Sequence, residues 1–448
     1  MEKELNSQHI STGKGLIALS PILVFLLLYV GVSVYIGDFY KMPLSITFIV
    51  AAIWALLCMP KMKITDRIEI FSSGAANTNI LYMIWIFLLA GAFSALAKGV
   101  GAVDATVNLT LSFLPASFLL PGLFITACFI SMSIGTSVGT IVALTPFACQ
   151  LAQSTGGNVA FYVSIVLGGS FFGDNLSFIS DTTIAATRSL KVKMNDKFKT
   201  NLWIALPAAL VVLCIYAFFT DPVAFTPSAN DASSGVLVIP YLIVIVTAII
   251  GLNVLLVLTL GIIACIIIAF CGVADASLIS MCGFMGEGIQ GMSDLIIVTL
   301  LAGGLLEVIS YNGGVKFIIQ FLTRRISGSR GAQSVVALLV SLVNVCTANN
   351  TIAIITVGKI ARQVATQFHL DARKVASILD TCSCIVQCLI PYGAQTLMAA
   401  GLAKLSPVAF LPYLYYTWAL AAMVVLSIIF NFPKSQPAAQ EAEDAQEA

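Results

Sequence analysis

The stretch GDNLSFISDTT, residues Gly173 to Thr183, holds two aspartates, two serines, an asparagine and two threonines directly after the apolar run VAFYVSIVLGGSFF. Polar side chains and interrupted backbone are costly in hydrocarbon unless they are buried in protein or line a water-filled cavity. If its surroundings are membrane-embedded, this stretch therefore predicts a polar break that faces a cavity.

The composition places the chain in a membrane. Hydrophobic residues make up 59% of the 448 positions and charged residues 10%, whereas soluble domains average about 45–50% and about 25%. The 22 basic and 21 acidic residues give a net charge of +1, which indicates no nucleic-acid partner. HExxH, Walker A and CxxC patterns are absent from the sequence, so we expect no enzyme and no cofactor.

Apolar runs near the ~20 residues that cross hydrocarbon indicate ten crossings and an all-α polytopic membrane protein. The runs cover residues 15–36, 43–59, 79–97, 117–134, 200–220, 236–252, 253–272, 293–311, 332–347 and 408–431. Segments 135–158, 159–190 and 349–403 are more polar or more interrupted than plain spans.

A weak internal repeat organises these runs. LLAG at Leu88–Gly91 recurs at Leu300–Gly303, 212 positions later, and the same shift brings the polar break GTSVGT (Gly135–Thr140) onto NVCTANNT (Asn344–Thr351). An odd number of crossings in each half would insert the second half upside down. Inverted repeats with interrupted helices are typical of secondary transporters, whose site lies near the bilayer midplane.

We therefore predict two inverted-topology repeats of about five transmembrane helices each, with broken helices and re-entrant hairpins, at residues 15–220 and 236–431. Residues 1–14 form a cytoplasmic N-terminus, 221–235 an external linker and 432–448 a disordered acidic tail. The linker carries no Lys or Arg, whereas the segments KMKITDR, RSLKVKMNDKFK and KFIIQFLTRRISGSR are basic, so the positive-inside rule places both termini in the cytoplasm.

The two polar breaks supply ligands for a hard cation. In the first, Gly135 and Gly139 release helical backbone, and Thr136 and Ser137 offer hydroxyls. The candidates in the second are Asn344, Asn349, Asn350 and Thr351. Freed carbonyls and side-chain oxygens together could coordinate Na+. The alternative is close helix packing through small residues, with the hydroxyls bonded to the preceding turn.

The opening stretch adds carboxylates. Asp174 and Asp181 are seven residues apart, and both can face one cavity if the segment is helical or forms the tip of a re-entrant hairpin. Its other oxygen ligands are Asn175, Ser177, Ser180, Thr182 and Thr183. Burial raises the pKa of a carboxylic acid and a bound cation lowers it, so one aspartate can hold either a proton or Na+. Alternatively, Asp181 only caps a helix and Asp174 lies in an aqueous loop. Asp380 is a further candidate, since it lies where the second half should repeat this stretch.

GTSVGT, FFGDNLSFISDTT and LIPYG resemble the NhaC-type sodium/proton antiporter family of the ion-transporter superfamily, over roughly residues 70–430. The resemblance implies a bacterial inner-membrane exchanger with two inverted halves, and a homodimer. The positions that match the family motifs are Gly135, Thr136, Gly139, Gly173, Asp174, Ser177, Ser180, Asp181, Thr182 and Thr183. Val138 and Phe178 depart from the family pattern, and some relatives exchange organic acids.

We thus expect Na+/H+ exchange by alternating access of the elevator type, with Asp174 and Asp181 as the Na+ ligands and Na+, H+ and membrane lipid as partners. The alternative is a cation-coupled carrier of a small carboxylate or amino acid that shares the same site. A third interpretation, from another class, is an intramembrane aspartyl protease.

Overall fold

The computed structural model describes residues 10–36, 41–113, 115–178, 180–218, 234–271, 276–323, 326 and 328–433. Within these ranges the regular structure is helical and no strand occurs. The predicted external linker lies outside the described residues except for its last two positions. The first nine residues and the acidic tail beyond residue 433 also lie outside them.

The first half of the chain forms α2 (Thr12–Ile36), α3 (Leu44–Leu57), α4 (Ile64–Ala75), α5 (Thr78–Gly99), α6 (Ala102–Phe113), η2 (Ala116–Phe118), α7 (Leu119–Ile134), α8 (Ser137–Ser154), α9 (Val159–Leu176), α10 (Asp181–Leu190) and α11 (Met194–Phe218). The second half forms α12 (Ser234–Leu237), α13 (Ile239–Ile249), α14 (Val254–Phe270), α15 (Leu278–Gln290), α16 (Ser293–Tyr311), α17 (Gly314–Thr323), α18 (Gly328–Thr347), α19 (Asn350–Gln367), α20 (Ala372–Leu389), α21 (Ala394–Ala403), η3 (Pro407–Tyr413) and α22 (Tyr415–Ile429).

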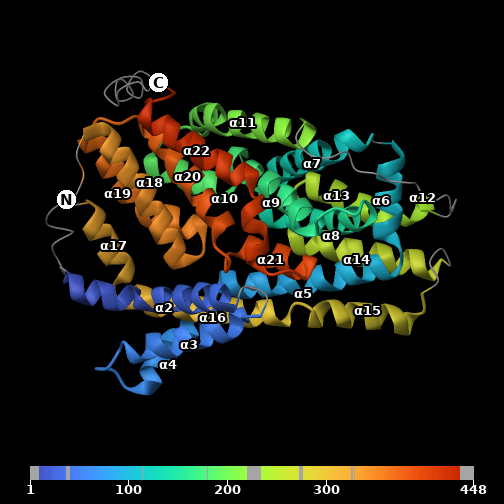
Figure 1. Ribbon diagram of the computed structural model, residues 1–448, viewed down its shortest axis with the longest axis horizontal. Helices are drawn as coiled ribbons and strands as arrows, with labels where there is room; N and C mark the ends of the chain where they lie inside the picture. Colours follow the sequence, from blue (N-terminus) through green and yellow to red (C-terminus); the bar gives the residue numbers. More distant parts are fainter. Residues whose placement is uncertain are drawn as a thin grey trace.

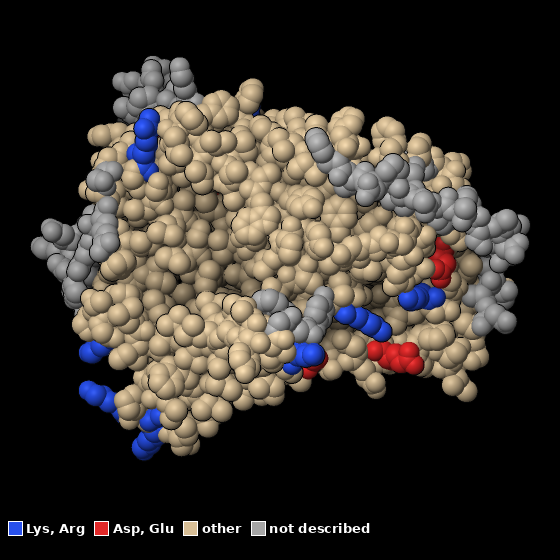
Figure 2. Space-filling view, viewed as in Figure 1, with Lys and Arg blue, Asp and Glu red and all other residues tan. Residues whose placement is uncertain are grey.

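The chain is a multi-pass membrane protein. Seven described helices are long and apolar enough to span a membrane, or eight if η3 and α22, bent by 59°, form one span. Large apolar side chains lie exposed along most helices, and Figure 2 shows a face with few charged residues and broad uncharged areas. The prediction of ten crossings is wrong, because several apolar runs contain only short helices. For example, α3 has 14 residues and α14 has 17.

The helices form two layers (Figure 1). One layer holds α2, α16 and α15 in a row, with α5 packed on α15 and α14 packed on α5. The other layer holds two groups, α7 to α11 and α18 to α22. The polar segments that interrupt the spans all belong to this second layer.

Two helical hairpins stand in the second layer. In the first, α7 runs parallel to α9, since Ser131 donates a hydrogen bond to the carbonyl of Ser170 and Ser177 to that of Met132. The short connection after α8 returns the chain to the start of α9, so α8 runs antiparallel to both. Gly135, with φ +75° in the left-handed region, reverses the chain at the tip. The hairpin of α18 and α19 turns in the same way at Ala348, with φ +47°.

The segment that begins with Asp174 is a broken span. Residues Val159–Leu190 read as one span of 32 residues, which is interrupted between α9 and α10. Ser177 and Ser180 have extended backbones there, so the chain continues instead of turning back. Ala372–Ala403 is interrupted likewise between α20 and α21. Of the two alternatives for the Asp174 stretch, the structure therefore has the helical span with a break, and the hairpins form at the GTSVGT and ANN segments.

The two halves repeat at an interval of 213 residues, one more than the sequence comparison indicated. This interval separates the first residues of α8 and α19, of α9 and α20, and of α10 and α21. It also separates the left-handed residues Gly135 and Ala348, and Lys191 and Lys404. The same interval pairs Asp174 with Gln387. These matches support the two-repeat prediction, while the inverted orientation of the halves stays a prediction.

Close backbone contact between α5 and α15 gives a testable expectation for the first layer. A Cβ on Gly288 would meet the carbonyl oxygen of Gly91 at 2.1 Å, whereas a Cβ on Gly286 would meet nothing within 4 Å. We expect Gly288→Ala to lower the melting temperature of the detergent-solubilised protein, because overpacking costs roughly 1–3 kcal/mol. Gly286→Ala should leave it unchanged or raise it, since alanine favours helix by about 1 kcal/mol. Equal melting temperatures for the two variants would contradict this packing.

Candidate functional site

A cavity of about 340 Å³ lies where the two hairpin tips and the two span breaks meet α5 and the turn between α13 and α14. Nine of the residues predicted for the site line it: Thr136, Ser137, Asp174, Ser180, Asp181, Thr182, Asn349, Asn350 and Thr351. Gly135 at the first hairpin tip also lines it. Polar residues from both halves of the chain therefore share one cavity, although more than 160 positions separate Asp181 from Asn349 in the sequence.

The carboxylate of Asp174 meets the first turn of α8. Its Oδ1 accepts a hydrogen bond from the backbone N–H of Ser137 at 3.1 Å, and its Oδ2 accepts one from the Ser137 hydroxyl at 2.6 Å. The hydroxyl of Ser180 donates to Oδ1 at 3.4 Å. Ser137 is the first residue of α8, so the positive end of that helix dipole faces the carboxylate. Asp174 is only 5% exposed, which makes it a buried acid on a cavity wall.

Asp181 has a different environment on the same wall. It is the first residue of α10, and Ser180 occupies the N-cap position without a capping hydrogen bond from its side chain. Asp181 is exposed. The interpretation of Asp181 as a helix cap is therefore wrong, and its charge stands where water reaches the cavity.

Two glutamines that the sequence interpretation missed connect the hairpin tips. Gln395 donates from Nε2 to the Ser137 hydroxyl oxygen at 3.2 Å, and Gln387 donates from Nε2 to Gln395 Oε1 at 3.0 Å. Gln387 also donates to the carbonyl of Ala348 at 3.0 Å. Hydrogen bonds thus run from Asp174 through Ser137 and both glutamines to the second hairpin tip. The interval of 213 residues pairs Gln387 with Asp174, whereas the shift of 212 seen in the sequence pairs Asp174 with Val386 and so missed this glutamine.

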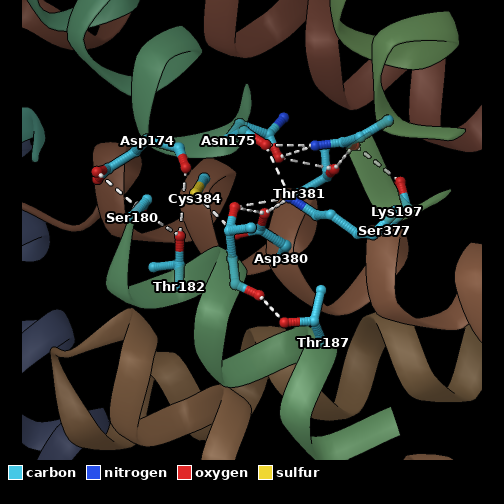
Figure 3. A network of polar contacts seen from close by, with 12 residues as sticks. Asp174, Asn175, Ser180, Thr182, Thr187, Lys197, Ser377, Asp380, Thr381 and Cys384 are labelled. Atoms are coloured by element: carbon cyan, nitrogen blue, oxygen red, sulfur yellow. Dashed lines mark hydrogen bonds and ion pairs between the residues drawn. The ribbon is translucent and has the colours of Figure 1, made fainter. Parts of the chain in front are cut away.

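Five predicted site residues do not line the cavity. Ser177 donates to the carbonyl of Met132 at 2.9 Å, and Asn344 donates from Nδ2 to the carbonyl of Ser383 at 2.8 Å, so both tie hairpin helices to broken spans. Asn175, Thr183 and Asp380 belong instead to a buried network that lies beside Asp174 (Figure 3).

Lys197 of α11 is part of that network. The sequence analysis placed this lysine in a basic cytoplasmic segment, but its side chain is 1% exposed and forms an ion pair with the fully buried Asp380. Nothing in the sequence indicated that Lys197 is buried, because it lies in a run of basic residues. Its neighbours Lys191, Lys193 and Lys199 are exposed.

The predicted structural glycines have separate roles. Gly135 takes the left-handed conformation at the first tip. Gly173 allows α9 to approach α7, since a Cβ there would meet Ser131 Cβ at 2.2 Å. Gly139 faces Val254 of α14, where a Cβ would meet Val254 Cγ2 at 3.1 Å.

A family model and curated relatives match this chain over most of its length. The profile of the Na+/H+ antiporter family matches residues 9–220 and 228–432. The malate-2H+/Na+-lactate antiporter of Bacillus subtilis is 21% identical, over 91% of this chain and 92% of its own. The Na+/H+ antiporter NhaC of Alkalihalophilus pseudofirmus is 24% identical, over 77% of this chain and 80% of its own. Among solved structures, the YdaH transporter of Alcanivorax borkumensis has a TM-score of 0.41 and 13% identity, over 83% of this chain and 89% of its own.

The contact between Ser137 and Asp174 can be tested directly. Ser137→Ala removes the 2.6 Å hydrogen bond to the carboxylate, and hydrogen bonds to charged groups contribute about 1.5–3 kcal/mol. We expect the Na+ concentration that gives half-maximal thermal stabilisation to rise about tenfold or more. Ser133→Ala is the matched control, because Ser133 bonds only to the carbonyl of Phe129 in its own helix. The same Na+ response in both variants would exclude a role for Ser137 in holding the acid.

Proposed function

This chain belongs to the Na+/H+ antiporter family, and we propose that it exchanges Na+ for H+ by alternating access, with Asp174 binding the two ions in turn. The observation that carries the proposal is the buried Asp174 carboxylate at the start of α8, on the wall of a cavity that both hairpin tips line. The proposal includes no catalytic activity, since the family is one of transporters.

The donor set around the cavity suits Na+ as the transported ion. Hard cations prefer carboxylate, hydroxyl, amide and backbone carbonyl oxygens. Asp174 supplies the charge, and Ser137, Asn349 and Asn350 supply neutral oxygens on the same cavity. Among the described residues no cluster of three or more His, Cys, Asp or Glu side chains forms a metal site, so we propose a site with one buried carboxylate and neutral ligands.

Competition for one acid explains exchange. A charged carboxylate without a counter-ion is costly to move through a low-dielectric barrier. When Asp174 carries either Na+ or a proton, the buried carboxylate is neutralised and the site can change sides. When Asp174 carries neither ion, its charge prevents the site from changing sides. Na+ therefore moves in one direction only when H+ moves in the other.

A second cavity supports an elevator-type movement. This cavity, of about 390 Å³, is lined by Gly91–Gly99 of α5 and by Pro146 and Gln153 of α8. The site cavity is lined by Asn79–Ile86 of α5 and by the first turn of α8. The two cavities therefore lie at opposite ends of the same pair of helices. We propose that the layer of hairpins and broken spans slides along α5 and so transfers the site from one side of the membrane to the other.

We also propose a bacterial inner-membrane location, a homodimer and a cytoplasmic position for both termini. The exposed Lys191, Lys193 and Lys199 between α10 and α11 support this orientation through the positive-inside rule.

A small organic acid or amino acid is the second candidate substrate. The cavity volume lies within the roughly 300–1,000 Å³ that small-molecule sites usually have. Two buried atoms on its wall have no hydrogen-bond partner: Asn350 Nδ2, a donor, and Gln387 Oε1, an acceptor. A ligand with a carboxylate and a hydroxyl or amino group could satisfy both. The lactate and malate of the Bacillus subtilis relative's name have this chemistry.

Proteoliposomes test the primary proposal. An imposed pH gradient should drive 22Na+ uptake by the wild type, and Asp174→Asn should abolish it because the amide cannot exchange a proton. Asp66→Asn on α4 is the matched control, since Asp66 is exposed and lies away from the cavity. Equal uptake by the wild type and Asp174→Asn would rule out Asp174 as the exchanging acid.

Thermal stabilisation separates the two candidate substrates. A ligand that binds only the folded protein raises the melting temperature. We expect Na+ and Li+ to stabilise the protein, and malate, lactate and arginine to add nothing in the presence of Na+. An organic solute that stabilises the wild type but not Gln387→Ala would favour the second candidate instead.

A further inference from the structure

A buried ion pair lies beside the site cavity, and neither of its residues lines the cavity. Lys197 on α11 and Asp380 on α20 form an ion pair whose side chains are 1% and 0% exposed. Figure 3 shows this pair on the far side of the α9 break from Asp174 Oδ1 and Ser180. Buried lysines and aspartates are rare unless paired, and the exchange of ions at Asp174 does not use this pair.

The ammonium of Lys197 sits in a cradle of oxygens. Besides Asp380 Oδ2, it donates to the backbone carbonyl of Asn175 at 2.8 Å and to the hydroxyl oxygen of Thr183 at 2.9 Å. Thr183 in turn donates to Asp380 Oδ2 at 3.2 Å. One carboxylate, one hydroxyl and one backbone carbonyl form the type of donor set that coordinates hard cations in proteins.

The broken span makes this cradle possible. Asn175 lies in the last turn of α9, where the carbonyls lack the i+4 partners of a continuing helix. Asp174, one position earlier, faces the cavity. The same interruption therefore presents a carboxylate to the cavity and, to Lys197, a carbonyl that no helical N–H group of the described residues occupies.

Neighbouring polar side chains hold the Asn175 side of the cradle without help from Lys197. Asn201 donates from Nδ2 to the carbonyl and to the side-chain oxygen of Asn175, both at 2.6 Å. The hydroxyls of Ser377 and Thr381 each donate to Asn201 Oδ1 at 2.8 Å. All four side chains are buried. The Asn175 carbonyl beside the ammonium is thus fixed by contacts among α9, α11 and α20.

We propose that Lys197 is a tethered cation that fills a second monovalent-cation site, formed by Asp380, Thr183 and the carbonyl of Asn175. Its ammonium neutralises Asp380 and so, in the proposed function, leaves Asp174 as the acid that exchanges ions. Removal of the ammonium opens the site to Na+ or to a small alkylammonium ion. The geometry of the cradle does not depend on the transport activity, so this proposal stands apart from the proposed function.

The test uses the full-length protein in detergent and an Asp174→Asn background, which silences the cavity acid. In Na+-free choline buffer, Lys197→Ala leaves Asp380 without its counter-ion. We expect Na+ and methylammonium to raise the melting temperature of Asp174→Asn/Lys197→Ala in a saturable way. Asp174→Asn alone and Asp174→Asn/Lys199→Ala should not respond, since Lys199 is exposed. Adding Asp380→Asn should remove the response.

A folded Asp174→Asn/Lys197→Ala protein that responds to neither cation would overturn the proposal, as would a response that survives Asp380→Asn. If the Lys197→Ala variant aggregates when it is purified in choline, we expect that Na+ or methylammonium, added during purification, restores a monodisperse protein. If neither cation does so, the proposal is overturned as well. A Na+ response of Asp174→Asn alone would instead count against the proposed function, because the cradle is still filled in that variant.

Discussion

The structure depends on one contact, the carboxylate of Asp174 against the first turn of α8. A buried acid needs hydrogen-bond donors, and a helix that starts inside the protein supplies them through its unpaired N–H groups and its dipole. That start exists only because Gly135 reverses the chain in the left-handed conformation. The hairpin, the break in the neighbouring span and the cavity therefore together stabilise a buried aspartate inside a membrane protein.

The interruption after α9 serves two polar environments at once. Asp174 faces the cavity and is connected through Ser137 and Gln395 to the second hairpin tip. Asn175 faces the protein interior, where its carbonyl accepts a hydrogen bond from Lys197. A shift of this segment would therefore disturb both environments.

Sequence reasoning found the helical class, the polar breaks and most of the polar residues on the cavity wall, because polar side chains inside apolar runs are energetically costly and therefore conspicuous in the sequence. It left open where the hairpins form, since a polar interruption has the same sequence pattern whether the chain turns back or continues. The difference lies in backbone conformation, left-handed at Gly135 and Ala348 but extended at Ser177 and Ser180. It overlooked Gln387 and Gln395, which are neutral, and Lys197, which resembles its exposed neighbours in sequence. Only the tertiary fold shows that one lysine in a basic run is buried.

The central claim is that Na+ and a proton compete for Asp174, and the most direct test is to count protons released when Na+ binds. In weakly buffered detergent solution, Na+ added to the wild type should release protons in proportion to the Na+ bound, and the release should disappear at high pH, where the acid has already lost its proton. Na+ binding that releases no protons at any pH would contradict the account.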